Sequence, residues 1–177
     1  MGFFENAPFE VVTKPEAARR QLATAISLCL ADGDAVSIRT LASAAHELLR
    51  VLVKAKGGRS TLFDNPLYSA EMQAGVRRGF KRPYNFFKHA DRDAGARMRF
   101  RPVLVEGILA DAVFMYHRVT GHYFPEAVVY IMYFFTVYEG ELGDHPLAVA
   151  LRKRWAEIEE PLRTRRDFFS ILRGRLG

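Results

Sequence analysis

The strongest constraint on the fold is a helical repeat of apolar residues between positions 38 and 52. Apolar side chains recur there at alternating steps of three and four, at Ile38, Leu41, Ala45, Leu48 and Leu52. This spacing places them on one face of an amphipathic α-helix, which must bury that face against another element. We expect Asp34 or Ser37 to cap the start of the helix and Gly57-Gly58 to end it.

A second helical pattern precedes this one. Thr13 and Glu16 have the spacing of a capping box, and Pro15 suits a first helical turn. Apolar and small residues then recur at helical intervals, at Ala18, Leu22, Ile26 and Cys29. The pattern ends at Ala31, before Asp32-Gly33-Asp34, so the two helices should form an antiparallel hairpin.

The rest of the chain also favours helices. We expect one helix from Asn65-Pro66 to about Gly79 and another that begins at Pro83. A further helix should run from Pro102 to Thr120-Gly121, and a very apolar one should begin at Pro125-Glu126. Asp144 should cap a last helical segment, which Pro161 breaks. A short stretch around Met98 to Arg101 is the only β candidate. We therefore predict one all-α domain over residues 1–177, a globular bundle of six or seven helices. The apolar helix after Pro125 favours a homodimer, because one small bundle would not easily bury it.

Charge and targeting signals limit the location and the partners of the protein. The N-terminus has no signal-peptide pattern, and the most apolar stretch, residues 127–138, is too short to span a membrane. We expect a cytoplasmic protein without membrane contact, with Cys29 as a small buried side chain. The formal net charge is +6, but residues 77–101 alone carry nine basic and two acidic groups, whereas residues 102–151 carry a net −5. A concentrated positive charge favours RNA or another anionic ligand, unless the acidic segment neutralises it.

The basic segment contains the motif Asn85-Phe86-Phe87-Lys88-His89-Ala90-Asp91-Arg92-Asp93. On a helix Arg82, Asn85, His89 and Asp93 would share one face, while the two phenylalanines would anchor the helix in the core. This set suits phosphodiester chemistry. The candidate catalytic residues are His89 as acid or base, Arg82 and Lys88 for phosphate charge, Asn85 as a positioning donor, and Asp93 to orient the imidazole.

The alternative is that the same residues have a structural role. A histidine near a helix end is commonly a cap, and Asn85 and His89 would then satisfy buried backbone groups between two helices. His46 lies beside the apolar face of its helix, which favours a half-buried, hydrogen-bonded histidine over a metal ligand, although that helix could also bring His46 or Glu47 beside His89. Asp91, Asp93 and His89 have a spacing that could bind a divalent ion, but no metal or cofactor motif is present, so neither is expected.

Two resemblances add to this reading. The motif above, together with Gln21 to Ile26, Gly33 to Ile38 and Thr40 to Ala42, resembles a bacterial family of uncharacterised proteins, over roughly residues 15–95. Arg82, six residues and His89 are similar to the signature of HEPN domains, although Pro83 stands where that family often has a polar residue. The second resemblance implies a small helical bundle, often dimeric, that cleaves RNA without a metal, with Arg and His facing their symmetry copies across a cleft.

Two main functions follow as hypotheses. The first is a HEPN-like, RNA-directed protein, acting as a metal-independent ribonuclease through the Arg, Asn and His face. The second is a non-enzymatic helical module that binds a protein or a nucleic acid and in which the motif is structural. A metal-dependent hydrolase that uses His89 and the nearby aspartates is a third, weaker alternative.

Overall fold

The computed structural model describes residues 8–89, 91, 93–138, 149 and 164–176. Within these ranges the chain forms α-helices and no β-strand, which confirms the all-α prediction and leaves Met98 to Arg101 as irregular chain. The helices are α1 (Lys14–Leu30), α2 (Ala35–Ala55), α3 (Ala70–Lys88), α4 (Leu104–Thr120), α5 (Pro125–Val137) and α8 (Arg165–Leu176). None of these helices is both long and apolar enough to cross a membrane. The helix predicted from Asp144 and the break predicted at Pro161 lie outside the described residues.

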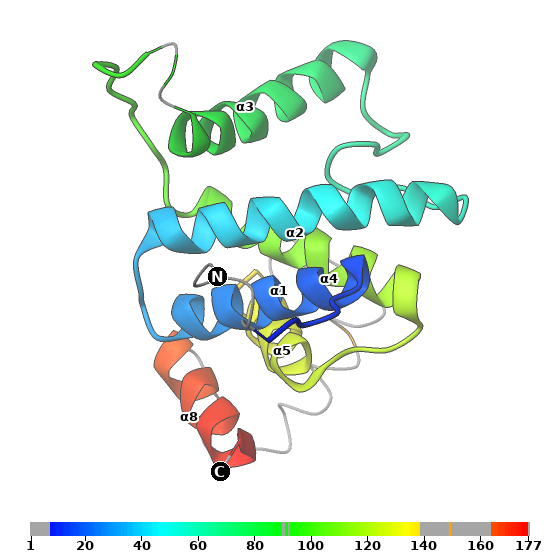
Figure 1. Ribbon diagram of the computed structural model, residues 1–177, viewed down its shortest axis with the longest axis vertical. Coiled ribbons are helices and arrows are strands. Elements are labelled where there is room, and N and C mark those ends of the chain that lie inside the picture. The colour runs from blue at the N-terminus through cyan, green and yellow to red at the C-terminus, as the bar shows by residue number, and fades with distance from the viewer. Residues whose placement is uncertain (1–7, 90, 92, 139–148, 150–163, 177) are drawn as a thin grey trace, which may run out of the picture.

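The predicted helical hairpin is confirmed at both of its starts. The Thr13 side chain accepts a hydrogen bond from the Glu16 N–H at 3.3 Å, and that of Asp34 accepts one from the Ser37 N–H at 2.7 Å. These contacts satisfy backbone donors that the first helical turn cannot pair internally. α1 and α2 then run antiparallel along their length (Figure 1).

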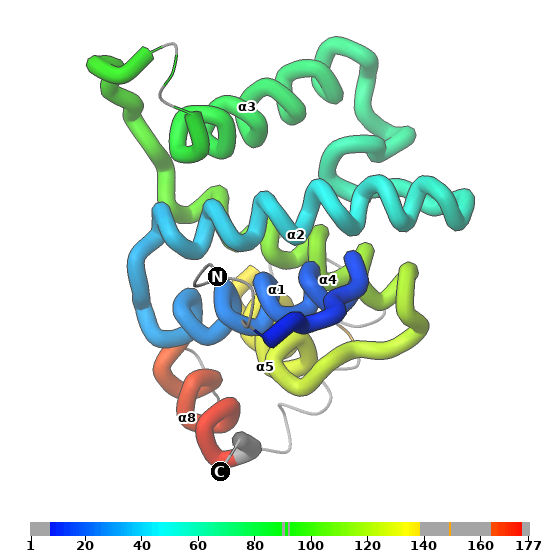
Figure 2. Tube along the Cα trace, in the orientation of Figure 1, coloured from blue at the N-terminus to red at the C-terminus, as the bar shows by residue number. Residues whose placement is uncertain are grey.

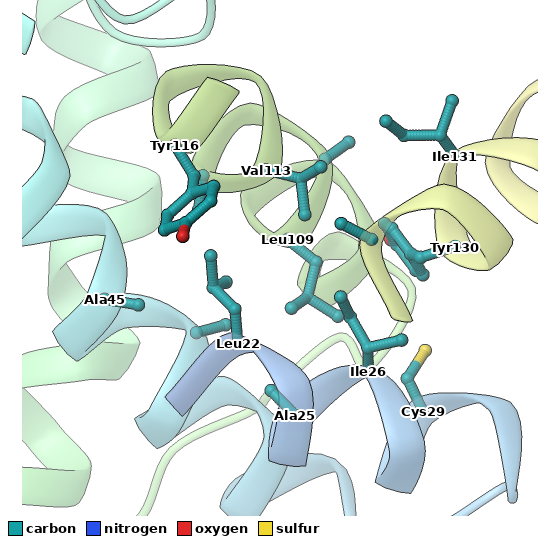
Figure 3. Close-up of a cluster of buried hydrophobic side chains, with 14 of the residues drawn as sticks. Leu22, Ala25, Ile26, Cys29, Ala45, Leu109, Val113, Tyr116, Tyr130 and Ile131 are labelled. Carbon is teal, nitrogen blue, oxygen red and sulfur yellow. The ribbon is translucent and has the colours of Figure 1, made fainter. Parts of the chain in front are cut away.

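The core lies among α1, α2, α4 and α5. Leu22 and Ile26 of α1 meet Leu109 and Val113 of α4, with Tyr130 of α5 completing the cluster (Figure 3). Burying each large apolar side chain contributes about 1.5–3 kcal/mol, so this cluster fixes α4 and α5 against the hairpin. Cys29 lies in the same core, and burial raises the pKa of its thiol to about 12, as expected for a packing residue rather than a nucleophile.

α3 differs from the sequence prediction, because one helix replaces the two that were expected. It starts at Ser69, whose side chain accepts a hydrogen bond from the Met72 N–H, and it continues through Pro83. The two starts predicted at Asn65-Pro66 and at Pro83 are therefore wrong. A proline inside a helix removes one backbone donor and crowds the preceding turn. Here the buried Arg39 of α2 donates a hydrogen bond to the Phe80 carbonyl, in the turn that precedes Pro83.

α3 is the outermost helix of the fold. It packs on α2, whereas α2 also contacts α1 and α4, so α2 lies between α3 and the main core. The tube in Figure 2 shows α3 separated from α1 by α2, and the chain after α3 returning to α4 on the side of the α2 N-terminus. Among the described helices, only α2 therefore packs substantially against α3.

α5 buries its apolar surface within the chain, against α1, α4 and α8. Six of its residues are buried, at Ala127, Val129, Tyr130, Ile131, Tyr133 and Phe135. Arg165 ties α8 to this part of the fold, because it forms an ion pair with buried Glu106 of α4. Its Nε also donates a hydrogen bond to the Tyr133 hydroxyl of α5 at 3.1 Å. The described residues do not test whether a second copy covers the rest of α5, so the homodimer stays a prediction.

Two glycines of α4 give a test of its end. Gly121 ends the helix with a φ of 83°, a left-handed conformation that costs other residues about 1–2 kcal/mol. Gly107 lies inside the helix, and an added Cβ there would meet no atom within 4 Å. We expect Gly121→Ala to destabilise the protein by about that amount and Gly107→Ala to stabilise it by about 0.5–1 kcal/mol. Urea unfolding of both variants measures the difference, and the same sign for both would contradict this account of the helix end.

Candidate functional site

A large pocket lies between the second half of α3 and residues of the segment that follows it, from Asp91 to Met98. Its volume is about 750 Å³. The polar side chains that line it are Arg78, Lys81, Arg82, Asn85, His89, Asp91, Asp93 and Arg97, and Phe86, Ala96 and Met98 supply its apolar part. The sequence motif therefore surrounds an accessible cavity rather than a packed interior.

α3 positions the first part of this site. Arg82 and Asn85 are three residues apart on the helix and so share a face. His89 follows as the C-cap residue, with its backbone N–H bonded to the Asn85 carbonyl at 3.0 Å. Their side chains are exposed, and within the described residues none of the three makes a side-chain hydrogen bond. Arg82, Asn85 and His89 thus present free polar groups to the pocket.

The anchoring of the helix is not quite as predicted. Tyr84 is the buried aromatic residue of α3, whereas Phe86 and Phe87 are only half-buried. Phe87 packs edge-on against Phe100 at 5.2 Å, which ties α3 to the returning chain. Phe86 lines the pocket, so it offers an apolar wall to a ligand instead of filling the core.

Two predicted site residues have a different setting from the one expected. α3 ends at Lys88, so Asp93 lies beyond the helix and not one helical turn from His89. Asp93 still lines the pocket, from the segment that follows α3. Lys88 does not line it. Its Nζ donates to the Tyr84 hydroxyl at 3.0 Å, and it borders a separate cavity with Glu47 of α2, so a role beside Arg82 is not supported.

The charge around the pocket is positive. Arg78, Lys81, Arg82 and Arg97 line it against two aspartates. No described acid of the segment 102–151 lines this pocket, and two of them are buried with other partners, Glu106 with Arg165 and Asp111 with His46. The described lining around Asn85 and His89 therefore carries a net positive charge, which favours an anionic ligand.

His46 has the structural role that was favoured. Its Nε2 lies 2.7 Å from Asp111 Oδ2, and both side chains are almost fully buried. Asp111 also accepts hydrogen bonds from the Ser60 hydroxyl and from the Thr61 and Leu62 N–H groups. This network ties the chain after α2 to α4, and it is separate from the pocket at His89.

The residue that sequence reasoning missed is Arg39. It lies on a polar stripe of α2 that continues through Ser43, His46 and Arg50, parallel to the apolar face. Arg39, Ser43 and His46 are all buried. The stripe has helical spacing and could have been found in the sequence, because polar residues repeated beside an apolar face indicate a second helix packed on that side.

Among the described residues, no group of three or more His, Cys, Asp and Glu side chains is arranged to hold a metal ion. Comparison with known proteins adds no relative, since no family model, curated protein or solved structure matches the chain. A function is therefore inferred from the residues of the pocket themselves.

Proposed function

We propose that the protein binds RNA at the α3 pocket and cleaves it without a metal ion, as HEPN-like ribonucleases do. The observation that carries the proposal is the presence of Arg82, Asn85 and His89 in one accessible, positively charged pocket. RNA supplies the matching groups, because a phosphodiester is an anion and the neighbouring 2′-hydroxyl is an internal nucleophile.

Each residue has a role in this reaction. The Arg82 guanidinium donates to the non-bridging phosphate oxygens and stabilises the charge that develops there. His89 accepts the proton of the 2′-hydroxyl while its oxygen attacks phosphorus, and the bond from phosphorus to the 5′ oxygen breaks. The leaving oxygen takes a proton from water, which gives a 2′,3′-cyclic phosphate and a 5′-hydroxyl. Asn85 positions the phosphate or the ribose through its amide, and Asp93 faces the same space.

The chemistry predicts a product that other mechanisms do not give. End-labelled single-stranded RNA is incubated with the protein in EDTA, and the fragments are separated on a denaturing gel. We expect cleavage that leaves 2′,3′-cyclic phosphate ends. A DNA strand with a single ribonucleotide should be cut only after that ribonucleotide, because it carries the only 2′-hydroxyl. Cleavage of all-DNA strands, or cleavage only with added Mg²⁺, would contradict the proposal.

A non-enzymatic binding module is the second candidate. It is favoured because, among the described residues that line the pocket, His89 supplies the one imidazole. Binding of RNA without any cleavage in the same assay would support the module. A second copy of the chain would supply a further His89, and cleavage per chain would then rise with protein concentration.

A further inference from the structure

A second pocket lies on the other side of Arg82. It has a volume of about 470 Å³ and lies between the first half of α2, the second half of α3 and the segment 97–104. Five arginines line it, at Arg39, Arg82, Arg97, Arg99 and Arg101, and no acidic residue does so in the described part of the chain. Arg82 and Arg97 also line the pocket at His89, so the two cavities are neighbours.

Arg39 gives this pocket a charge that is held inside the protein. The residue is 1% exposed. Its guanidinium donates to the Phe80 carbonyl and lies 5.2 Å from the centre of the Phe80 ring. Its Nε has no hydrogen-bond partner, and no carboxylate pairs with it in the described residues. Burial lowers the pKa of Arg39 to about 10, so the group stays charged at neutral pH.

A buried charge without a counter-charge is costly for the folded protein. An anion in the pocket would reduce this cost, and its attraction to Arg39 is stronger than on an open surface because the surroundings are less polar than water. Arg39 is also already ordered by its packing, so it loses little conformational freedom when an anion binds. The four exposed arginines can then make the direct contacts.

We propose that this pocket is a phosphate-binding site. Guanidinium groups match phosphate oxygens with paired hydrogen bonds, and five of them suit a group that can carry two negative charges better than a single carboxylate. The phosphate can belong to a small phosphorylated molecule or to the end of an RNA strand that continues into the pocket at His89. The proposal does not depend on cleavage at His89.

The test compares two variants that lose the same charge. Arg99→Gln/Arg101→Gln removes two exposed arginines that line only this pocket, and Arg78→Gln/Lys81→Gln removes two exposed cations that line only the pocket at His89. Inorganic phosphate is titrated by calorimetry at constant ionic strength. We expect the first variant to weaken phosphate binding about ten-fold or more and the second to leave it within about two-fold. Equal weakening by both, or no binding to the wild type at millimolar phosphate, would overturn the proposal.

Arg39 itself is tested with the charge retained or removed. Arg39→Lys keeps a positive charge but loses the paired N–H donors of the guanidinium, whereas Arg39→Gln removes the charge as well. We therefore expect phosphate affinity to fall from wild type to Arg39→Lys and further to Arg39→Gln. Circular dichroism first establishes which variants are folded, and the exposed double variants keep the test valid if these two are not. Phosphate binding unchanged in a folded Arg39→Gln protein would exclude Arg39 from the site.

Two further ligands identify the source of the phosphate. Adenosine 5′-monophosphate represents a small molecule, and a short RNA is compared with and without its 5′-phosphate. A gain from the 5′-phosphate that disappears in Arg99→Gln/Arg101→Gln assigns the site to RNA ends, whereas tighter binding of the mononucleotide assigns it to small phosphates. His89 does not line this pocket, so His89→Ala should bind phosphate as the wild type does. RNA cleavage and phosphate binding are therefore measured separately, and either proposal can fail without the other.

Discussion

Replacing His89 with alanine is expected to lower the rate of RNA cleavage about 100- to 10,000-fold, the range typical of losing a general acid–base residue. The side chain lines the α3 pocket, is exposed, and forms no hydrogen bond within the described residues. Its removal should therefore leave the fold unchanged. The measurement is the initial rate of cleavage of a short labelled RNA in EDTA, with the melting temperature recorded for the same preparation.

Lys88→Ala is the matched control. It removes a neighbouring exposed cation whose Nζ bonds to the Tyr84 hydroxyl instead of facing the pocket. We expect this variant to cleave RNA at close to the wild-type rate. An equal loss in both variants would mean that the net charge of this surface matters and not the imidazole. Retained cleavage in His89→Ala would remove the catalytic assignment.

The same pair of measurements separates the catalytic from the architectural role of the motif. If Asn85 and His89 held α3 against α2, His89→Ala would lower the melting temperature. The contacts between these helices come instead from other residues, namely buried Tyr84 and the bond from Arg39 to the Phe80 carbonyl. We therefore expect less than about 2 °C of change, which corresponds to under about 1 kcal/mol for a chain of this size.

The sequence predicts helices well wherever one face is continuously apolar. The hairpin of α1 and α2 follows from local signals alone, because each N-cap, Thr13 and Asp34, lies within a few residues of the start of the apolar repeat of its own helix. α3 is more polar, buries only Tyr84 and contains an internal proline, so local rules divide it into two helices. The structure has one continuous helix instead, and Arg39 of α2 donates to the carbonyl of Phe80, 41 residues further along the chain, which ties the middle of α3 to α2.

The candidate site also contains residues that the sequence predicts and residues that it does not. Arg82, Asn85 and His89 are close in sequence, and helical spacing alone brings them to one pocket. The buried polar groups could not be placed by such rules. Asp111 meets His46 across 65 residues and Ser60 across 51, and Glu106 meets Arg165 across 59. Spacing within one helix contains no information about which distant side chain will be the partner.

Replacing Asp111 with alanine is expected to destabilise the protein by about 3–5 kcal/mol, as is typical when one partner of a buried polar pair is removed. His46, the Ser60 hydroxyl and the N–H groups of Thr61 and Leu62 would all lose their acceptor in a buried site. Urea unfolding at pH 7 measures the change. Asp34→Asn is a matched exposed variant, and we expect little effect from it because Asn also caps helices well.

The pH dependence identifies the charge of Asp111 as the cause. Burial alone would raise the pKa of Asp111, but hydrogen bonds from His46, Ser60 and the Leu62 N–H outweigh it and hold the pKa below its usual value. The ordinary aspartate pKa is about 3.9. Because the folded pKa is lower, the stabilisation is fully present above that pH and is lost as the pH falls through the folded pKa. The difference in unfolding free energy between wild type and Asp111→Asn should therefore shrink below about pH 4. A difference that stays constant from pH 7 to pH 3 would show that the shape of the side chain, and not its charge, stabilises this junction between α2 and α4.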